Sequence, residues 1–204
     1  MKIHDLPVGP IQANCYLLCD EEAKQCAVID AGGEGAKIAR AVKGTGCAPV
    51  AIFHTHGHYD HTGGVAELQE LWPDVPVYIN QRDQHADDPR FWQLCPLLKN
   101  TTNYDEGTVL TVGSLKIEVL ATPGHSGGSV TLKCGDCLFT GDTLFAGSCG
   151  RTDFPDGSMR TILDSLKRLG ELEGEWNVLP GHMENSTMEA ERRYNPYLRQ
   201  ALKG

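Results

Sequence analysis

The sequence lacks the features of a membrane or exported protein. No uninterrupted apolar run in its 204 residues approaches the ~20 residues of a membrane-spanning helix. Residues 1–5 carry neither the charged start nor the apolar core of a signal peptide, so we expect a cytoplasmic protein that does not bind membranes. Its eight cysteines should then stay reduced, and most fall inside apparent strands or helices as small apolar side chains.

Positive charge is also scarce. The chain has 18 Lys and Arg against 27 Asp and Glu, which makes a formal net charge of −9. Because nucleic-acid binding draws its affinity from clustered Lys and Arg, this balance argues against a nucleic-acid partner. The hydrophobic content of 40% is enough to build a buried core, and we expect one domain over residues 1–204.

Side chains that bind metal ions are concentrated in one short segment, residues 55–64, between an apolar strand at 50–53 and a helical pattern. Its potential ligands are His56, His58, Asp60 and His61. A turn that follows a strand lies at the carboxyl edge of a sheet, where open α/β folds bind ligands. One ion cannot easily take all four donors, because the first two leave an extended segment and the last two begin a helix. Two adjacent ions can, if other parts of the chain complete their shells.

Three later segments offer the missing donors. Each ends an apolar run and contains a glycine that lets the backbone turn tightly beside the donor. They are Thr122-Pro123-Gly124-His125, Phe139-Thr140-Gly141-Asp142 and Leu179-Pro180-Gly181-His182. A structural zinc site is the alternative, but such sites favour closed, Cys-rich shells, whereas mixed His and Asp donors favour open, water-bearing coordination.

In this order and with these flanks, the segments resemble the metallo-β-lactamase fold superfamily, and within it the glyoxalase II-like hydrolases, along nearly the whole chain. The resemblance implies an α+β fold, a four-layer αβ/βα sandwich with metals at one edge between its two sheets. It also implies two divalent metal ions, with zinc expected and iron or manganese as alternatives. Residue by residue, it assigns His56, His58 and His125 to one ion, Asp60, His61 and His182 to the other, and Asp142 to both.

The activity that this resemblance implies is thioester hydrolysis, with S-D-lactoylglutathione or a related acyl thioester as the small-molecule substrate. A hydroxide that bridges the metals, beside the catalytic carboxylates Asp60 and Asp142, would attack a polarised carbonyl carbon. Short, single-domain members of the family are the most similar, because the chain ends soon after residues 194–198, without the C-terminal helical domain of long glyoxalase II enzymes.

The segment after Asp142 is expected to border the metals and to contact the substrate through Cys149 and Arg151. Arg151 matches a position at which a basic residue of glyoxalase II binds the glutathione part, and its planar guanidinium suits a carboxylate. An ion pair with Asp153 or Asp156 is the alternative role.

Related activities use nearly the same ligands. A persulfide dioxygenase-like enzyme would hold one Fe(II) with His56, His125 and Asp142. That branch typically has Pro-Ala-His where this chain has Pro-Gly-His at 180–182, so the sequence favours the hydrolase. A lactonase and a non-catalytic metal-binding module are more distant alternatives.

Periodicity predicts the elements that carry these motifs. Strands are expected near 2–6, 14–19, 25–30, 50–53, 77–80, 108–112, 115–120 and 176–179, a hairpin at 130–141, and helices at 34–43, after 64 and at 158–169. Ser158 should cap the last helix. Cys134 and Cys137 have the spacing of a redox or zinc pair, but the flanking strands favour a hairpin turn.

Other side chains have no assigned chemistry. His54 is expected to pack or to form a hydrogen bond behind the ligands, and His4 and His85 are expected at the surface. The irregular segment 83–102 is expected to be a packed loop, with a substrate wall as the alternative. The large apolar residues that would pack there are Phe91, Trp92, Leu94 and Leu97.

Overall fold

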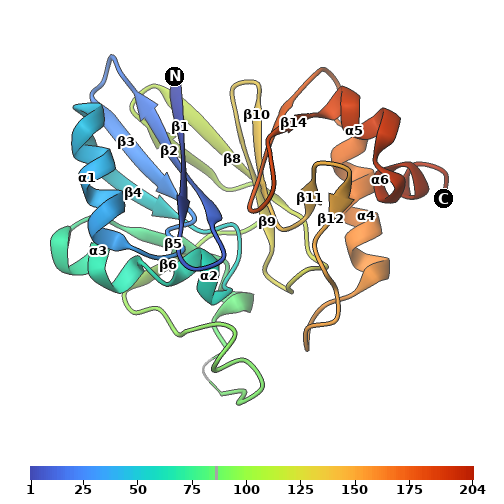
Figure 1. Cartoon of the computed structure of the whole chain (residues 1–204), viewed down its shortest axis with the longest axis horizontal. Coiled ribbons are helices and arrows are strands. Elements are labelled where there is room, and N and C mark those ends of the chain that lie inside the picture. Colours follow the sequence, from blue (N-terminus) through green and yellow to red (C-terminus); the bar gives the residue numbers. More distant parts are fainter. Residues whose placement is uncertain (86) are drawn as a thin grey trace.

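Two six-stranded sheets face each other in the computed structural model, which describes residues 1–85 and 87–204 (Figure 1). The first sheet runs β1 (Lys2–Val8), β2 (Ala13–Asp20), β3 (Gln25–Ile29), β4 (Ala48–Phe53), β5 (Val77–Ile79) and β6 (Thr101–Asn103). Strands β1 to β3 pair antiparallel, and β3 to β6 pair parallel. The carboxyl ends of β3, β4 and β5 therefore meet at one edge of the sheet.

The second sheet brings distant segments to that same edge. In spatial order it contains β14 (Ser186–Thr187), β13 (Asn177–Pro180), β10 (Cys137–Gly141), β9 (Val130–Cys134), β8 (Leu115–Ala121) and β7 (Val109–Val112). All neighbours are antiparallel except β10 and β13. Because that pair is parallel, Asp142 and His182 follow strands that end side by side. A short hairpin, β11 (Leu144–Phe145) and β12 (Ser148–Cys149), comes next in the chain after Asp142.

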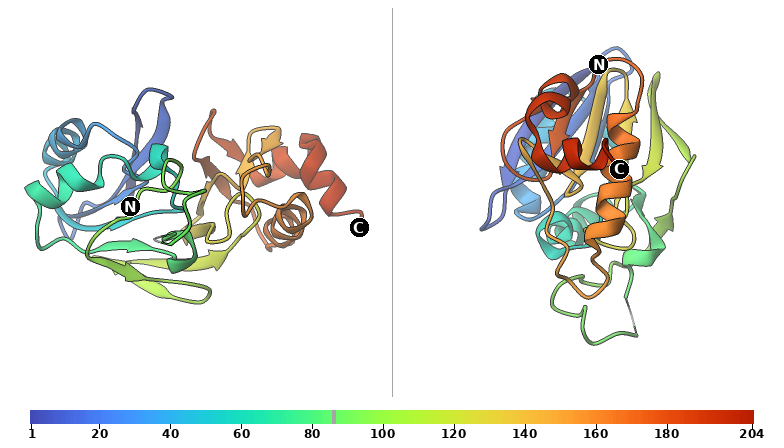
Figure 2. Two further views of the ribbon diagram at one scale, coloured as in Figure 1. Left: turned by 90° about the horizontal axis from the view of Figure 1, so that it is seen from below. Right: turned by 90° about the vertical axis from the view of Figure 1, so that its right-hand side faces the viewer.

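Helices cover the outer face of each sheet (Figure 2). The first sheet carries α1 (Gly35–Thr45) and α3 (Val65–Leu71), and the second carries α4 (Met159–Gly170), α5 (Met188–Tyr194) and α6 (Pro196–Ala201). A single turn, α2 (Tyr59–Thr62), and a 3-10 helix, η1 (Gln81–Asp83), lie near the edge with the histidines. The predicted α+β fold, a four-layer αβ/βα sandwich, is confirmed.

The alternation of side chains along the central strands explains the layers. Ile29 and Phe53 point between the sheets, whereas their neighbours Val28 and Ile52 pack under α1 and α3. A strand buried on both faces needs continuous apolar sequence, as these strands have. A third apolar cluster, which includes Leu166 of α4, fills the space between the second sheet and its helices.

Local predictions were confirmed at two places. The side chain of Ser158 caps α4 by accepting a hydrogen bond from the backbone N–H of Thr161. Cys134 and Cys137 face each other across a tight hairpin in which Gly135 has a φ of 59°, so their spacing follows from the turn. All eight cysteines are free thiols.

One prediction of packing was confirmed only in part, and one surface prediction was wrong. In segment 83–102, Phe91 is buried, but Trp92 and Leu97 are 63% and 58% exposed, so the segment packs only in part. His4 and His85 are half-buried rather than at the surface. In the described part of the chain, no helix is both long and apolar enough to cross a membrane.

Candidate metal centre

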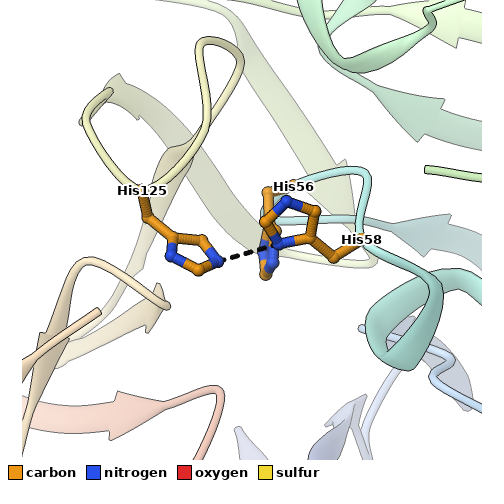
Figure 3. Close-up of side chains that lie close together, drawn as sticks. All are labelled: His56, His58 and His125. Carbon is orange, nitrogen blue, oxygen red and sulfur yellow. Dashed lines mark hydrogen bonds between the residues drawn. The ribbon is translucent and has the colours of Figure 1, made fainter. Parts of the chain in front are cut away.

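The histidine motif turns at the edge shared by the two sheets. Strand β4 ends at Phe53, and the backbone of His58 is still extended before α2 begins. Gly57 allows this turn to pass close to η1, because a Cβ there would lie 2.7 Å from the carbonyl oxygen of Asp83. On the opposite sheet, His125 lies in the loop between β8 and β9. Figure 3 shows the imidazoles of His56, His58 and His125 converging from these two loops.

These three histidines form the first group of possible ligands. One ring nitrogen from each lies within 4.8 Å of the other two. His125 Nε2 is 2.8 Å from His58 Nδ1 (Figure 3). All three side chains are buried. The group offers a tripod of nitrogens of the kind that binds a catalytic metal.

Asp60, His61 and His182 form the second group, again with one donor atom each within 4.8 Å. His182 Nε2 lies 3.1 Å from Asp60 Oδ2 and 3.3 Å from His61 Nε2. His61 comes from α2, and His182 follows β13 in the other sheet. The group therefore spans both halves of the fold.

Asp142 lies between the two groups. Its Oδ1 is 3.3 Å from His61 Nε2, and its Oδ2 is 3.4 Å from His125 Nε2 and 3.7 Å from His182 Nε2. Gly181 is needed beside it, since a Cβ at that position would overlap Asp142 Oδ1. The structure thus brings together all seven donors that were predicted from the sequence.

Hydrogen bonds behind the histidines orient their rings. His61 Nδ1 lies 3.1 Å from Asp30 Oδ2, and His125 Nδ1 lies 2.7 Å from the carbonyl oxygen of Arg151. His56 Nδ1 lies 3.1 Å from the hydroxyl of Thr55, which itself donates to Asp30. Carboxylate and carbonyl oxygens only accept, so Nδ1 carries the hydrogen and Nε2 turns its lone pair toward the centre.

Two buried aspartates that hold this arrangement were not predicted from the sequence. Asp30 accepts hydrogen bonds from the N–H and the hydroxyl of Thr55, at 2.8 and 2.7 Å. Asp83 accepts from Gly57 N at 2.8 Å, Gly128 N at 2.6 Å and the Ser126 hydroxyl at 2.7 Å. Asp30 follows β3 at the carboxyl edge of the sheet, which is a signal that could have identified it. Asp83 carries no such signal.

The donor set fits metal ions. His56 Nε2 and His58 Nε2 are buried without a hydrogen-bond partner. Burial lowers the pKa of His58 to about 3 and the pKa of His56 well below its usual value, so both imidazoles are neutral and have a free lone pair. Burial alone would raise the pKa of Asp142, but the charge and the hydrogen bond of His61 outweigh burial. The pKa of Asp142 is therefore below its usual value, which keeps the carboxylate ionised.

The charge balance of the second group points the same way. Burial lowers the pKa of His61, but the charges of Asp142 and Asp30 outweigh it and raise the pKa well above the usual value. Three carboxylates around one imidazole call for positive charge, which divalent cations would supply. His54, which was left out of the site, is fully buried with its Nδ1 3.9 Å from Asp30 Oδ1.

A cavity of about 410 Å³ opens beside the donors. Leu94 and Phe154 line its wall, so the substrate-wall alternative for segment 83–102 applies to Leu94. Cys149 also lines it, and burial raises the pKa of this thiol to about 11, which keeps it protonated at neutral pH. A larger groove of about 510 Å³ lies between α1 and α3, away from the metal donors.

Arg151 lines the same cavity and also forms an ion pair. Its Nε and a terminal nitrogen donate to the two carboxylate oxygens of Asp153 at 2.6 and 2.5 Å, and its guanidinium lies 4.5 Å from the centroid of the Phe154 ring. Both partners of the pair are more than 60% exposed. The ion pair named as an alternative from the sequence is therefore present, in a position from which the arginine still borders the cavity.

Comparison with known proteins agrees with this geometry. Residues 8–182 match the model of the metallo-beta-lactamase superfamily. The probable metallo-hydrolase YqgX of Bacillus subtilis is 39% identical, and the hydroxyacylglutathione hydrolase GloC of Haemophilus influenzae is 31% identical, each alignment covering 97% of this chain and 98% of the relative.

Solved structures show the same relationship. TTHA1623 in a di-iron-bound form superimposes with a TM-score of 0.82 at 37% identity, covering 95% of this chain and 99% of the other. ETHE1 from Myxococcus xanthus gives a TM-score of 0.81 at 29% identity, with 96% of this chain and 84% of the other covered. With its two donor groups at the shared edge of two sheets, the chain belongs to the metallo-beta-lactamase superfamily.

Proposed function

We propose that this protein is a dinuclear metal-dependent hydrolase that cleaves acyl thioesters such as S-D-lactoylglutathione. The observation that carries the proposal is the position of Asp142, whose two oxygens lie 3.3 Å from His61 and 3.4 Å from His125. These histidines belong to different donor groups. A carboxylate that faces both groups suits a shared ligand of two ions, as sites with two metals about 3.5–4 Å apart require.

Two divalent ions held by these donors would lower the pKa of water into the neutral range and polarise a substrate carbonyl. The chain itself supplies neutral imidazoles at His56 and His58 and ionised carboxylates at Asp60 and Asp142. Zinc is the metal we expect from this mixture of nitrogen and oxygen donors, with iron or manganese as alternatives.

The cavity supports a small, anionic thioester as substrate. Its volume of about 410 Å³ is that of a small-molecule site, and Arg151 places a guanidinium at its wall. We expect a carboxylate of the glutathione part to replace Asp153 on this arginine, because exchange of an exposed ion pair costs little free energy. The protonated thiol of Cys149 would contact substrate without acting as a nucleophile. GloC, the relative named as a hydroxyacylglutathione hydrolase, supports this substrate class.

A persulfide dioxygenase-like activity is the second candidate. It would need one Fe(II) on His56, His125 and Asp142, and the last two lie 3.4 Å apart on the cavity side. The second donor group would then have no role, although Asp60, His61 and His182 are all present and in contact. The complete second group favours the hydrolase.

The test compares the two reactions on the purified, metal-loaded protein. Hydrolysis of S-D-lactoylglutathione is followed by release of the thiol, and dioxygenase activity by oxygen uptake with glutathione persulfide. Thioester turnover without oxygen uptake supports the proposal. Oxygen uptake with one iron per chain and no hydrolysis would move the assignment to the dioxygenase.

A further inference from the structure

Among the described residues, buried polar atoms without a hydrogen-bond partner gather in two places. One is the metal centre with the adjacent His54. The other contains His85 Nε2 and Asp156 Oδ1, and the preceding residue of His85, Gln84, also has an unpartnered Nε2. Because folded proteins satisfy nearly all buried polar atoms, atoms without a protein partner indicate a position where a water or an ion binds. The metal ions proposed above account for the unpartnered atoms of His56, His58 and Asp142, but not for those of the second place.

Asp83 completes this second cluster. Asp83, His85 and Asp156 each offer one donor atom within 4.8 Å of the other two, which is the spacing found in the metal centre. Asp83 is fully buried, whereas the side chains of His85 and Asp156 are 17% and 20% exposed. The cluster is therefore shielded but keeps a route to solvent. The ring of His85 is held in place by stacking on Phe91, with centroids 3.5 Å apart and planes at 11°.

The protein partners leave part of this donor set free. Asp156 Oδ2 accepts a hydrogen bond from Gly127 N at 2.6 Å, while Oδ1 has no partner. His85 Nε2 lies 3.7 Å from Asp156 Oδ2, which is too long for a hydrogen bond. Asp83 is ordered by three donors from the ligand loops, so its position does not depend on His85. Two carboxylates thus share a mostly buried space with one imidazole.

We propose that Asp83, His85 and Asp156 bind a further divalent cation, separate from the metal centre. Two carboxylates and one imidazole suit a first-row ion such as Zn²⁺ or Mn²⁺, with water in the remaining positions. The cation joins segment 83–102 of one half to the turn at Asp156 of the other. Those segments carry Leu94 and Phe154 to the cavity wall, so the bound ion holds the two sides of the cavity together.

The experiment counts metal ions in variants that keep the shape of the cluster. Wild type, His85→Gln and Asp156→Asn are dialysed to equilibrium against buffered free Zn²⁺ and, separately, Mn²⁺, and metal per chain is measured by elemental analysis. We expect both variants to bind one equivalent fewer than wild type with at least one of these ions. His4→Gln is the matched control, since His4 is also half-buried but lies on β1, and it should bind as many as wild type.

Thermal unfolding supplies a second readout for the same proteins. The added ion should raise Tm less in the two cluster variants than in wild type and in His4→Gln, because a ligand stabilises only the state that binds it. Equal metal content and equal Tm shifts in all four proteins would overturn the proposal. The comparison rests on a difference from wild type, so it stands whether the main centre holds two ions or one.

Discussion

Replacement of Asp30 by Asn tests how the metal ligands are oriented. Asp30 Oδ2 lies 3.1 Å from His61 Nδ1 and 2.7 Å from the hydroxyl of Thr55, which in turn lies 3.1 Å from His56 Nδ1. One buried carboxylate therefore fixes the hydrogen on both rings, directly for His61 and through Thr55 for His56. Asn has the same shape, but it has no charge and only one accepting oxygen. Since Oδ1 of Asp30 accepts from the backbone N–H of Thr55, the NH₂ group of Asn meets either that N–H or both contacts at the Oδ2 position.

We expect Asp30→Asn to weaken metal affinity about 10- to 100-fold, which is the usual effect of losing a partner behind a metal ligand. That loss corresponds to about 1.4–2.8 kcal/mol of binding free energy. The assay is a competition titration of the metal-free protein against a chromophoric chelator, followed by steady-state thioester hydrolysis at saturating metal.

Asp20→Asn is the matched control. Asp20 is buried like Asp30 and accepts hydrogen bonds from Ser114 and from the turn after β2. It lies at the end of β2, whereas the loop that carries His182 contacts the start of β2, through Asn14. Asp20 is therefore far from the metal centre. This variant should lose stability and keep its metal affinity. If Asp30→Asn binds metal as tightly as wild type, or if both variants lose affinity equally, Asp30 does not orient the ligands.

Three further predictions follow from the same structure. Asp142→Ala should lose one or both metals and nearly all hydrolysis, and retained turnover with full metal content by elemental analysis would contradict its shared position. Arg151→Ala should raise KM for an anionic glutathione thioester more than for a neutral thioester; equal changes would indicate only the ion pair with Asp153. Hydrogen bonds from Ser114 and Ala23 hold the pKa of Asp20 below its usual value. The contribution of this carboxylate to stability is therefore complete above its pKa in the unfolded chain, about 3.9, and is lost as pH falls toward its lower pKa in the folded protein. The difference in unfolding free energy between wild type and Asp20→Asn, measured in urea, should therefore shrink below about pH 4, and a constant difference would contradict this.

The donors of the metal centre could be predicted because local sequence determines them. A strand that ends in His-x-His-x-Asp-His must turn at a sheet edge, and Gly124, Gly141 and Gly181 mark the other turns. Hydrophobic alternation likewise predicted the strands that form the central core.

What the sequence did not predict depends on contacts between distant segments. Asp30 reaches His61 only because β3 and β4 pair in parallel, and His85 meets Asp156 only when the two halves fold together. Trp92 and Leu97 are exposed because residues 87–100 form a loop outside the layers (Figure 1), where apolar composition alone does not ensure burial. Proximity in the sequence predicted an ion pair of Arg151 with either Asp153 or Asp156, and in the structure the partner is Asp153.

The central claim is that hydrolysis needs two ions on the groups joined by Asp142. The most direct measurement is reconstitution of the metal-free His85→Gln variant, which should lack the further cation site, with increasing zinc, while S-D-lactoylglutathione hydrolysis is followed at each step. We predict that activity continues to rise until two equivalents are bound and then stays constant. Full activity at one equivalent, or no hydrolysis at any zinc content, would contradict the account.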